Sequence, residues 1–191
     1  QNNPQLLFLL GTAYVQIEKT IEGIDYLKKS LSIKPENASA HSNLGNAFKN
    51  LNRYEEALES FNKAIQLNPN FADAYSNRGV ILQEMKRFDE ALQSYDSAIK
   101  LNPNHFFSHG NKGITLKDLN RYDEAIKSYD KAIQINPNFI EAYNNKGNAL
   151  KDLKRFSEAL DNYKKILEIK PEYEYNIGRV LHFSMFICDW K

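Results

Sequence analysis

Apolar residues recur along the chain with the spacing of one face of an α-helix. In one such stretch they fall at i, i+1, i+4, i+7 and i+8, at Ala57, Leu58, Phe61, Ala64 and Ile65. The spacing predicts a first helix over about 39–51 and a second over about 54–67. Asn68-Pro69-Asn70 should end the second helix, because proline has no N–H to donate and restricts the residue before it.

The same pattern returns with a fixed period of 34 residues. Five prolines follow it, at Pro35, Pro69, Pro103, Pro137 and Pro171. Five glycines follow it too, at Gly11, Gly45, Gly79, Gly113 and Gly147. A fixed period of this kind indicates stacked supersecondary units, each of which buries its apolar face only against its neighbours.

Small residues in each unit predict where its two helices approach closely. Besides the glycines of the first helix, the second helix carries Ala57, Ala91, Ala125 and Ala159. Each alanine is followed by a large partner that should fill the next layer, namely Phe61, Tyr95, Tyr129 and Tyr163.

The start of the second helix carries polar residues with capping spacing. Asn52 with Glu55, and Asn120 with Asp123, have the spacing of an N-cap and its reciprocal acid. Acids in this first turn favour the helix dipole, so they need no general acid or base role.

These positions resemble the tetratricopeptide repeat: a small residue at position eight, alanine at twenty, an aromatic at twenty-four and proline at thirty-two. The resemblance implies an all-α fold, a right-handed superhelical solenoid of five helix-turn-helix units plus a C-terminal helix. The units would be 4–37, 38–71, 72–105, 106–139 and 140–173, with 174–191 as a capping or junction helix. The first unit is degenerate, since Thr20, Gly23 and Leu27 replace the usual residues.

Composition narrows the function classes. The 191 residues include 25 Lys and Arg against 24 Asp and Glu, a net charge of +1. This balance lacks the basic surplus that phosphate-backbone binding uses, so we expect no nucleic-acid partner. A single cysteine, Cys188, fits a reducing, cytoplasmic compartment. The apolar run Leu6–Leu10 is too short to span a bilayer, so no membrane association is expected, and a first residue of Gln1 suggests a piece of a longer protein.

The sequence contains little evidence for a catalytic or metal-binding site. His41 and His109 occupy the unit position of Tyr75 and Tyr143, which predicts packing roles. His182 lies near Cys188 and Asp189, but no second cysteine or histidine–carboxylate helix motif completes a metal or nucleophilic site. We therefore expect no enzyme activity, cofactor or metal site in this chain.

A polar stripe runs along the first helix of each unit. The resemblance to the tetratricopeptide repeat implies that this face lines the inner groove of the superhelix. Position six is asparagine in four units, at Asn43, Asn77, Asn111 and Asn145. An amide can pair with the C=O and N–H of an extended peptide whatever its sequence. Alternatively, these amides only bond neighbouring helices or water.

Other polar positions accompany the asparagines. The predicted peptide-binding groove also includes Asn46, Asn148, Lys49, Lys117 and Lys151. The lysines and nearby acids would form a mixed-charge wall, and the expected partners are extended polypeptide segments or partner proteins. The basic clamp of co-chaperone domains is missing, because position five is Ser42, Ser76, Gly110 and Asn144.

The C-terminal stretch departs from the repeat, with Arg179 at the asparagine position. Residues 180–190 resemble the junction that follows the repeats in bacterial and plant-type O-linked N-acetylglucosamine transferases of the SPINDLY kind. That junction ends in Cys-Asp-Trp, which corresponds here to Cys188, Asp189 and Trp190. This resemblance implies a substrate-recognition arm whose catalytic domain would lie beyond Lys191. The alternative is a freestanding scaffold that assembles protein complexes.

The same stretch is unusually apolar for one packing face. It carries Val180, Leu181, Phe183, Phe186, Ile187 and Trp190. Such a surface is typical of a contact with a partner. In a longer protein that partner would be the next domain, and for this chain alone self-association through this end is expected.

Overall fold

The computed structural model describes residues 3–172 and 174–188, without the side chains of 174–176, 183 and 186–188. This part of the chain is helical and contains no strand, which confirms the all-α fold class. Its helices are α1 (Pro4–Gln16), α2 (Thr20–Ile33), α3 (Ala38–Asn50), α4 (Tyr54–Leu67), α5 (Ala72–Glu84), α6 (Phe88–Leu101), α7 (Phe106–Asp118), α8 (Tyr122–Ile135), α9 (Ile140–Asp152), α10 (Phe156–Ile169) and α11 (Glu174–Cys188).

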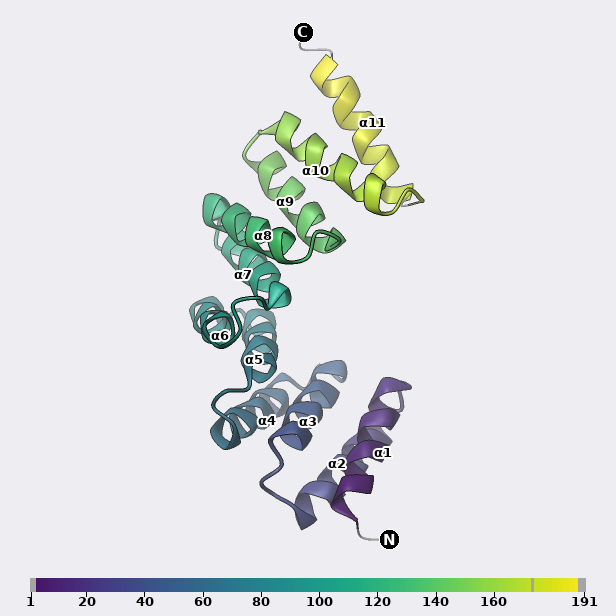
Figure 1. The fold of residues 1–191 in the computed structure, drawn as a ribbon, viewed down its shortest axis with the longest axis vertical. Helices are drawn as coiled ribbons and strands as arrows, with labels where there is room; N and C mark the ends of the chain where they lie inside the picture. Colours follow the sequence, from purple (N-terminus) through teal and green to yellow (C-terminus); the bar gives the residue numbers. More distant parts are fainter. Residues whose placement is uncertain (1–2, 173, 189–191) are drawn as a thin grey trace. The chain divides into compact units, whose positions relative to one another are not determined.

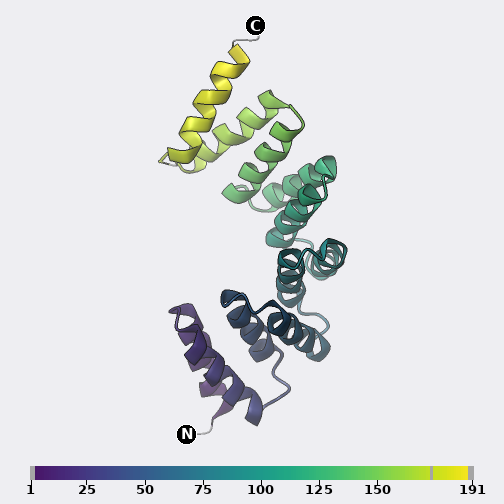
Figure 2. The same cartoon turned by 180° about the vertical axis from the view of Figure 1, so that it is seen from behind.

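The chain divides into two compact bodies. The N-terminal body, residues 1–103, contains α1–α6, and the C-terminal body, residues 104–191, contains α7–α11. Within each body the helices pack in pairs, as Figure 1 shows from one side and Figure 2 from behind. Successive pairs are joined because α2 packs on α3, α4 on α5, α8 on α9 and α10 on α11.

In four helix pairs, from α3 and α4 to α9 and α10, an aromatic ring lies on a glycine. The rings of Phe61, Tyr95, Tyr129 and Tyr163 are fully buried. A Cβ added to Gly79 would lie 2.5 Å from Tyr95 Cε1, and one added to Gly113 would lie 2.5 Å from Tyr129 Cε1. The glycines are therefore required by close helix approach within a unit, in agreement with the sequence prediction.

The degenerate first pair solves the same packing problem with different residues. Leu27 is fully buried and takes the place of the aromatic ring. A Cβ on Gly11 would lie 2.8 Å from Leu27 Cγ, and one on Gly23 would lie 2.6 Å from Val15 Cγ2. Because Val15 fills this space, α1 and α2 need a second glycine where the later units have alanine.

The predicted N-caps at Asn52 and Asn120 are wrong. The N-cap of α4 is Arg53 and that of α8 is Arg121, one residue later. Asn52 and Asn120 instead adopt left-handed backbone conformations, with φ of 57° and 58°. The three-residue connection between the two helices makes this turn, and asparagine tolerates the left-handed conformation better than most residues.

The capping arginines pair with the glutamate three residues later. Arg87 donates to Glu90 through Nε and Nη2, both at 2.7 Å, and Arg53, Arg121 and Arg155 make the same kind of pair. The Arg87 guanidinium lowers the pKa of Glu90 below its ordinary value. These exposed pairs orient the first turn but stabilise the fold only weakly.

The last helix packs on α10 and also makes a polar contact with α9. Arg179 Nη1 donates to Asn144 Oδ1 at 2.6 Å, and its guanidinium lies 5.1 Å from the centre of the Tyr163 ring. Leu181 and Met185 are 60% and 68% exposed. The predicted apolar contributions of Phe183, Phe186, Ile187 and Trp190 lie outside the described side chains, as does the Cys188–Asp189 pair.

Candidate functional site

A groove in the C-terminal body brings two of the predicted asparagines together. Asn111 of α7 and Asn145 of α9 are half-buried and line one cavity with a volume of about 500 Å³. The other lining residues are Phe106, Phe107, Gly110, Ile114, Asn136, Asn138, Phe139, Glu141 and Ala142. Since α7 and α9 are in contact, the two amides lie on neighbouring first helices, as the repeat period predicts.

The loop before α9 forms one wall of this groove. Asn136 Oδ1 accepts a hydrogen bond from the Asn138 N–H at 3.1 Å, and the Phe139 N–H donates to the Asn136 carbonyl at 3.1 Å. These bonds fix Phe139 as the N-cap residue of α9. Its ring reaches α7 because position 110 has no side chain: a Cβ on Gly110 would lie 2.9 Å from Phe139 Cε1.

Three phenylalanines cluster at the groove. The ring centres of Phe106 and Phe107 are 4.1 Å apart, and those of Phe107 and Phe139 are 5.6 Å apart at an interplanar angle of 80°. Phe107 is nevertheless 53% exposed. Phe106 and Phe139 were not predicted as groove residues. The sequence does contain one indication of this cluster, because Phe107 stands where the other regular units have Ser39, Asp73 and Glu141.

The other predicted groove residues have different surroundings. Asn43 is half-buried on α3, where its Nδ2 donates to Thr12 Oγ1 of α1 at 2.8 Å. Asn77 is half-buried on α5, and Asn46 is half-buried on α3. Asn148 Oδ1 accepts a hydrogen bond from the Tyr163 hydroxyl at 3.0 Å, which ties this amide to the packing of α10.

The three predicted lysines do not line the groove of α7 and α9. Lys49 and Lys117 lie in the last turns of α3 and α7, where a positive charge is favourable to the helix dipole. Lys151 Nζ lies 3.7 Å from Asp152 Oδ1. Glu141 is the one charged residue among those lining this groove.

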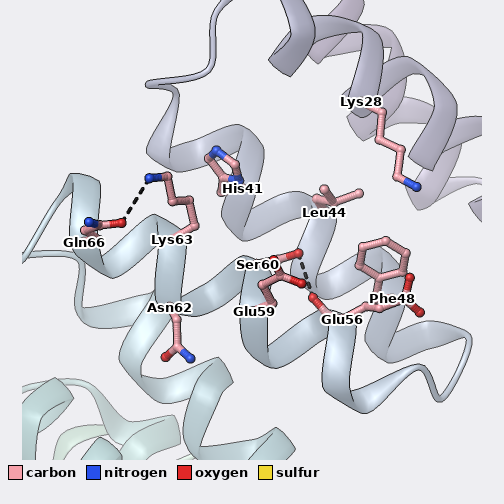
Figure 3. Close-up of a pocket in the computed structure, with 10 residues that line it drawn as sticks. All are labelled: Lys28, His41, Leu44, Phe48, Glu56, Glu59, Ser60, Asn62, Lys63 and Gln66. Atoms are coloured by element: carbon pink, nitrogen blue, oxygen red, sulfur yellow. Dashed lines mark hydrogen bonds between the residues drawn. The ribbon is translucent and has the colours of Figure 1, made fainter.

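A second pocket lies in the N-terminal body between α2, α3 and α4 (Figure 3). Its volume is about 760 Å³, and it is lined by Lys28, His41, Leu44, Phe48, Glu56, Glu59, Ser60, Asn62, Lys63 and Gln66. His41 is half-buried here, and its Nε2 lies 2.9 Å from the Pro35 carbonyl. Phe48 also lines this pocket, with Lys28 Nζ 5.6 Å from its ring centre.

The size of this pocket follows from a missing polar pair. In the next unit Arg78 occupies the position of Leu44 and donates to Asn62 at 3.3 Å, and the corresponding pocket has a volume of only about 270 Å³. In the C-terminal body Lys146 takes this position and bonds Asp130 at 2.5 Å. Leu44 cannot make such a bridge, so the space beside Lys28 stays open.

Neither pocket contains a recognisable catalytic constellation. Among the described residues no group of three His, Cys, Asp or Glu side chains is placed to hold a metal ion. None of the described helices combines the length and hydropathy that crossing a membrane would need.

Family comparisons agree with the helix pairs. Models described as tetratricopeptide repeat match residues 38–71, 72–105 and 140–173, residues 94–127, and residues 4–37. A model described as TPR repeat matches residues 113–154. The chain therefore belongs to the tetratricopeptide-repeat family and is a module of the protein-interaction class.

Solved structures show the same architecture. A crystal structure of MamA is 26% identical with a TM-score of 0.76, covering 90% of this chain and 94% of that chain. The pilF protein of Pseudomonas aeruginosa is 22% identical with a TM-score of 0.86, covering 97% and 85%. YrrB, described as a TPR protein with an unusual peptide-binding site, is 20% identical with a TM-score of 0.71, covering 93% and 92%.

At these identities the likeness to pilF and YrrB establishes the fold alone. No curated protein matches the chain in sequence. The comparisons do not support the resemblance of residues 180–190 to the O-linked N-acetylglucosamine transferases, since the structures named above are other TPR proteins.

Proposed function

We propose that this chain is a scaffold module that assembles protein complexes by binding an extended polypeptide segment in the groove of α7 and α9. The observation that carries the proposal is that Asn111 and Asn145, one repeat apart, line the same groove. Each amide offers a carbonyl acceptor and two N–H donors, which match the backbone of an extended chain.

The glycosyltransferase-arm hypothesis rests on residues 180–190, many of whose side chains are outside the described part. The groove geometry does not depend on it, because a backbone-reading groove serves a scaffold and a substrate-recognition arm equally. MamA, which is similar over nine-tenths of this chain, favours the scaffold as the function to test first.

The test uses the full chain and synthetic peptides of about 10 residues, which span roughly 33 Å when extended. Binding of an arrayed, unrelated peptide set is measured by fluorescence polarisation on the wild-type chain and on the Asn111→Ala/Asn145→Ala variant. Each lost amide–backbone pair removes about 0.5–1.5 kcal/mol. The double variant should therefore bind the peptides that the wild-type chain binds about 5- to 150-fold more weakly than the wild type does.

Asn148→Ala is the matched control, because Asn148 lies on α9 with Asn145 but accepts a hydrogen bond from the Tyr163 hydroxyl. This variant should lose stability and keep peptide binding, whereas the double variant should do the reverse. If the double variant binds peptides as well as the wild type, or if the wild type binds none, the groove proposal is wrong.

A further inference from the structure

The groove of α7 and α9 differs from a pure backbone reader, because an exposed aromatic side chain stands beside its amides. Position two of the unit is Ser39, Asp73 and Glu141 in the other regular repeats and Phe107 in this one. Phe107 keeps 53% of its surface exposed despite its contacts with Phe106 and Phe139. Core packing therefore does not account for this ring, and its exposed surface can contact an apolar side chain of a ligand.

The apolar surface continues along α7. Ile114 lies one helical turn beyond Gly110, and both line the groove together with Phe107. Phe139 meets Phe106 edge-on, with ring centres 5.0 Å apart at an angle of 78°. The exposed face of Phe107 can receive one large side chain against this cluster, with tilted aromatic contacts that favour an aromatic over a small residue.

The charge of the groove is one-sided. Glu141, in the first turn of α9, is exposed and is the one charged residue among the lining residues. A lysine or arginine of the ligand would be attracted here, and a carboxylate would be repelled. Phe107 and Glu141 occupy the same unit position on α7 and α9. Because these two helices are in contact, the two positions are separated by about 8–10 Å, the usual distance between packed helix axes.

We infer that the groove selects extended segments that carry a large apolar residue, preferably aromatic, with a lysine or arginine about three residues away. That spacing follows because an extended chain in the polyproline II conformation advances about 3.1 Å per residue and returns its side chains to the same face every third residue, which matches the 8–10 Å between the two helices. The inference rests on the proposed function, in which Asn111 and Asn145 hold the backbone of the same segment. It names the chemistry of the segment, which backbone contacts alone leave open.

The test compares four synthetic peptides that share one polar background. The first has Phe and Lys three residues apart, the second has Ala in place of Phe, the third has Glu in place of Lys, and the fourth has both changes. Affinities are measured for the wild-type chain and for its Phe107→Ala and Glu141→Lys variants. Phe107→Gln provides a second, polar replacement, and thermal unfolding of each variant verifies that it is folded.

The wild type should prefer the Phe peptide over the Ala peptide by about 10- to 100-fold, the usual effect of burying one large apolar side chain. Phe107→Ala should remove most of this preference. Glu141→Lys should reverse the preference between Lys and Glu peptides, by about two- to five-fold each way because the pair is exposed. Glu55→Lys on α4 and Leu9→Ala on α1 are matched controls and should change neither preference.

The outcomes separate the inference from the proposed function. If all four peptides bind equally, and binding still depends on Asn111 and Asn145, the apolar-and-basic selection is wrong and the backbone groove stands. If none binds, the proposed function fails with it. A preference for the Phe peptide over the Ala peptide that survives in Phe107→Ala and Phe107→Gln would also overturn the inference, because the Phe side chain of the peptide would then bind elsewhere.

Discussion

Tyr95, Tyr129 and Tyr163 occupy the same position in three repeats, yet their hydroxyl groups have different surroundings. Tyr95 donates to Gln83 Oε1 at 3.1 Å, and Tyr163 donates to Asn148 Oδ1 at 3.0 Å. The corresponding neighbours of Tyr129 are Lys117 and Ile114, and its buried hydroxyl has no hydrogen-bond partner among the described residues. Burial raises the pKa of the Tyr129 phenol, and the charge of Asp118 raises it further.

This difference predicts opposite effects of one substitution. Tyr129→Phe removes a buried, unpaired hydroxyl and should raise the free energy of unfolding by about 1 kcal/mol. Tyr95→Phe and Tyr163→Phe each remove a hydrogen bond and should lower it by about 1 kcal/mol. Urea unfolding followed by far-UV circular dichroism measures all three. An equal loss in all three variants would show that the Tyr129 hydroxyl has a partner, such as a bound water.

Residue roles were readable from the sequence where the period fixed them. The aromatic and glycine positions meet because one helical hairpin repeats, and this could be predicted. The surroundings of Phe107 could not, since they depend on Gly110 and on a loop conformation that brings Phe139 against α7. Asn111 and Asn145 were predicted as groove residues, whereas the partners of Asn43 and Asn148 required coordinates.

At the scale of elements, every turn inside a helix pair contains one left-handed residue. These residues are Glu18, Asn52, Lys86, Asn120 and Lys154, with φ between 57° and 64°. Hydrophobic spacing located the helices because it reports their buried faces. It could not identify the caps, because a cap depends on the backbone conformation of one residue, and so the N-caps fell one residue later than predicted.

The turns make a graded prediction. A residue with a side chain is strained in this conformation by about 1–2 kcal/mol, and glycine is not. Lys86→Gly and Lys154→Gly should therefore raise the free energy of unfolding by about 0.5–1 kcal/mol, after the added freedom of the unfolded chain is subtracted. Asn52→Gly and Asn120→Gly are the matched comparison and should gain less, because asparagine tolerates the left-handed region.

Chemical denaturation of the four variants, at one temperature and pH, measures these gains. The asparagine variants also lose a side-chain acceptor, since Asn52 accepts from the Tyr54 hydroxyl at 3.1 Å and Asn120 from the Tyr122 hydroxyl at 3.0 Å. Equal gains at all four positions would contradict the strain argument, as would any loss at Lys86 or Lys154.

At the scale of the whole molecule, packing is local in sequence. In the N-terminal body α3 contacts α1, α2, α4 and α5, and in the C-terminal body α9 contacts α7, α8 and α10. Each helix therefore depends on its immediate neighbours for burial, as expected of a repeat array. A strained repeat should loosen its own pair and the pairs beside it before it affects distant ones.

Gly113→Ala tests this locality in the full chain. The new Cβ would lie 2.5 Å from Cε1 of the fully buried Tyr129 ring, so α7 and α8 must separate or the ring must leave its rotamer. Overpacking of this kind costs about 1–3 kcal/mol, partly offset by the better helix propensity of alanine, about 1 kcal/mol. Hydrogen exchange should accelerate in α7 and α8, less in α9, and not in α1–α4.

Gly178→Ala in α11 is the matched control, because a Cβ there meets nothing within 4 Å. This variant gains helix propensity without a clash and should slow exchange in α11 or leave it unchanged. Faster exchange in all helices of Gly113→Ala, at one common rate, would show that the chain unfolds as a single cooperative unit. In that case the stability of the peptide groove would depend on every repeat, and the local packing would not limit how strain spreads.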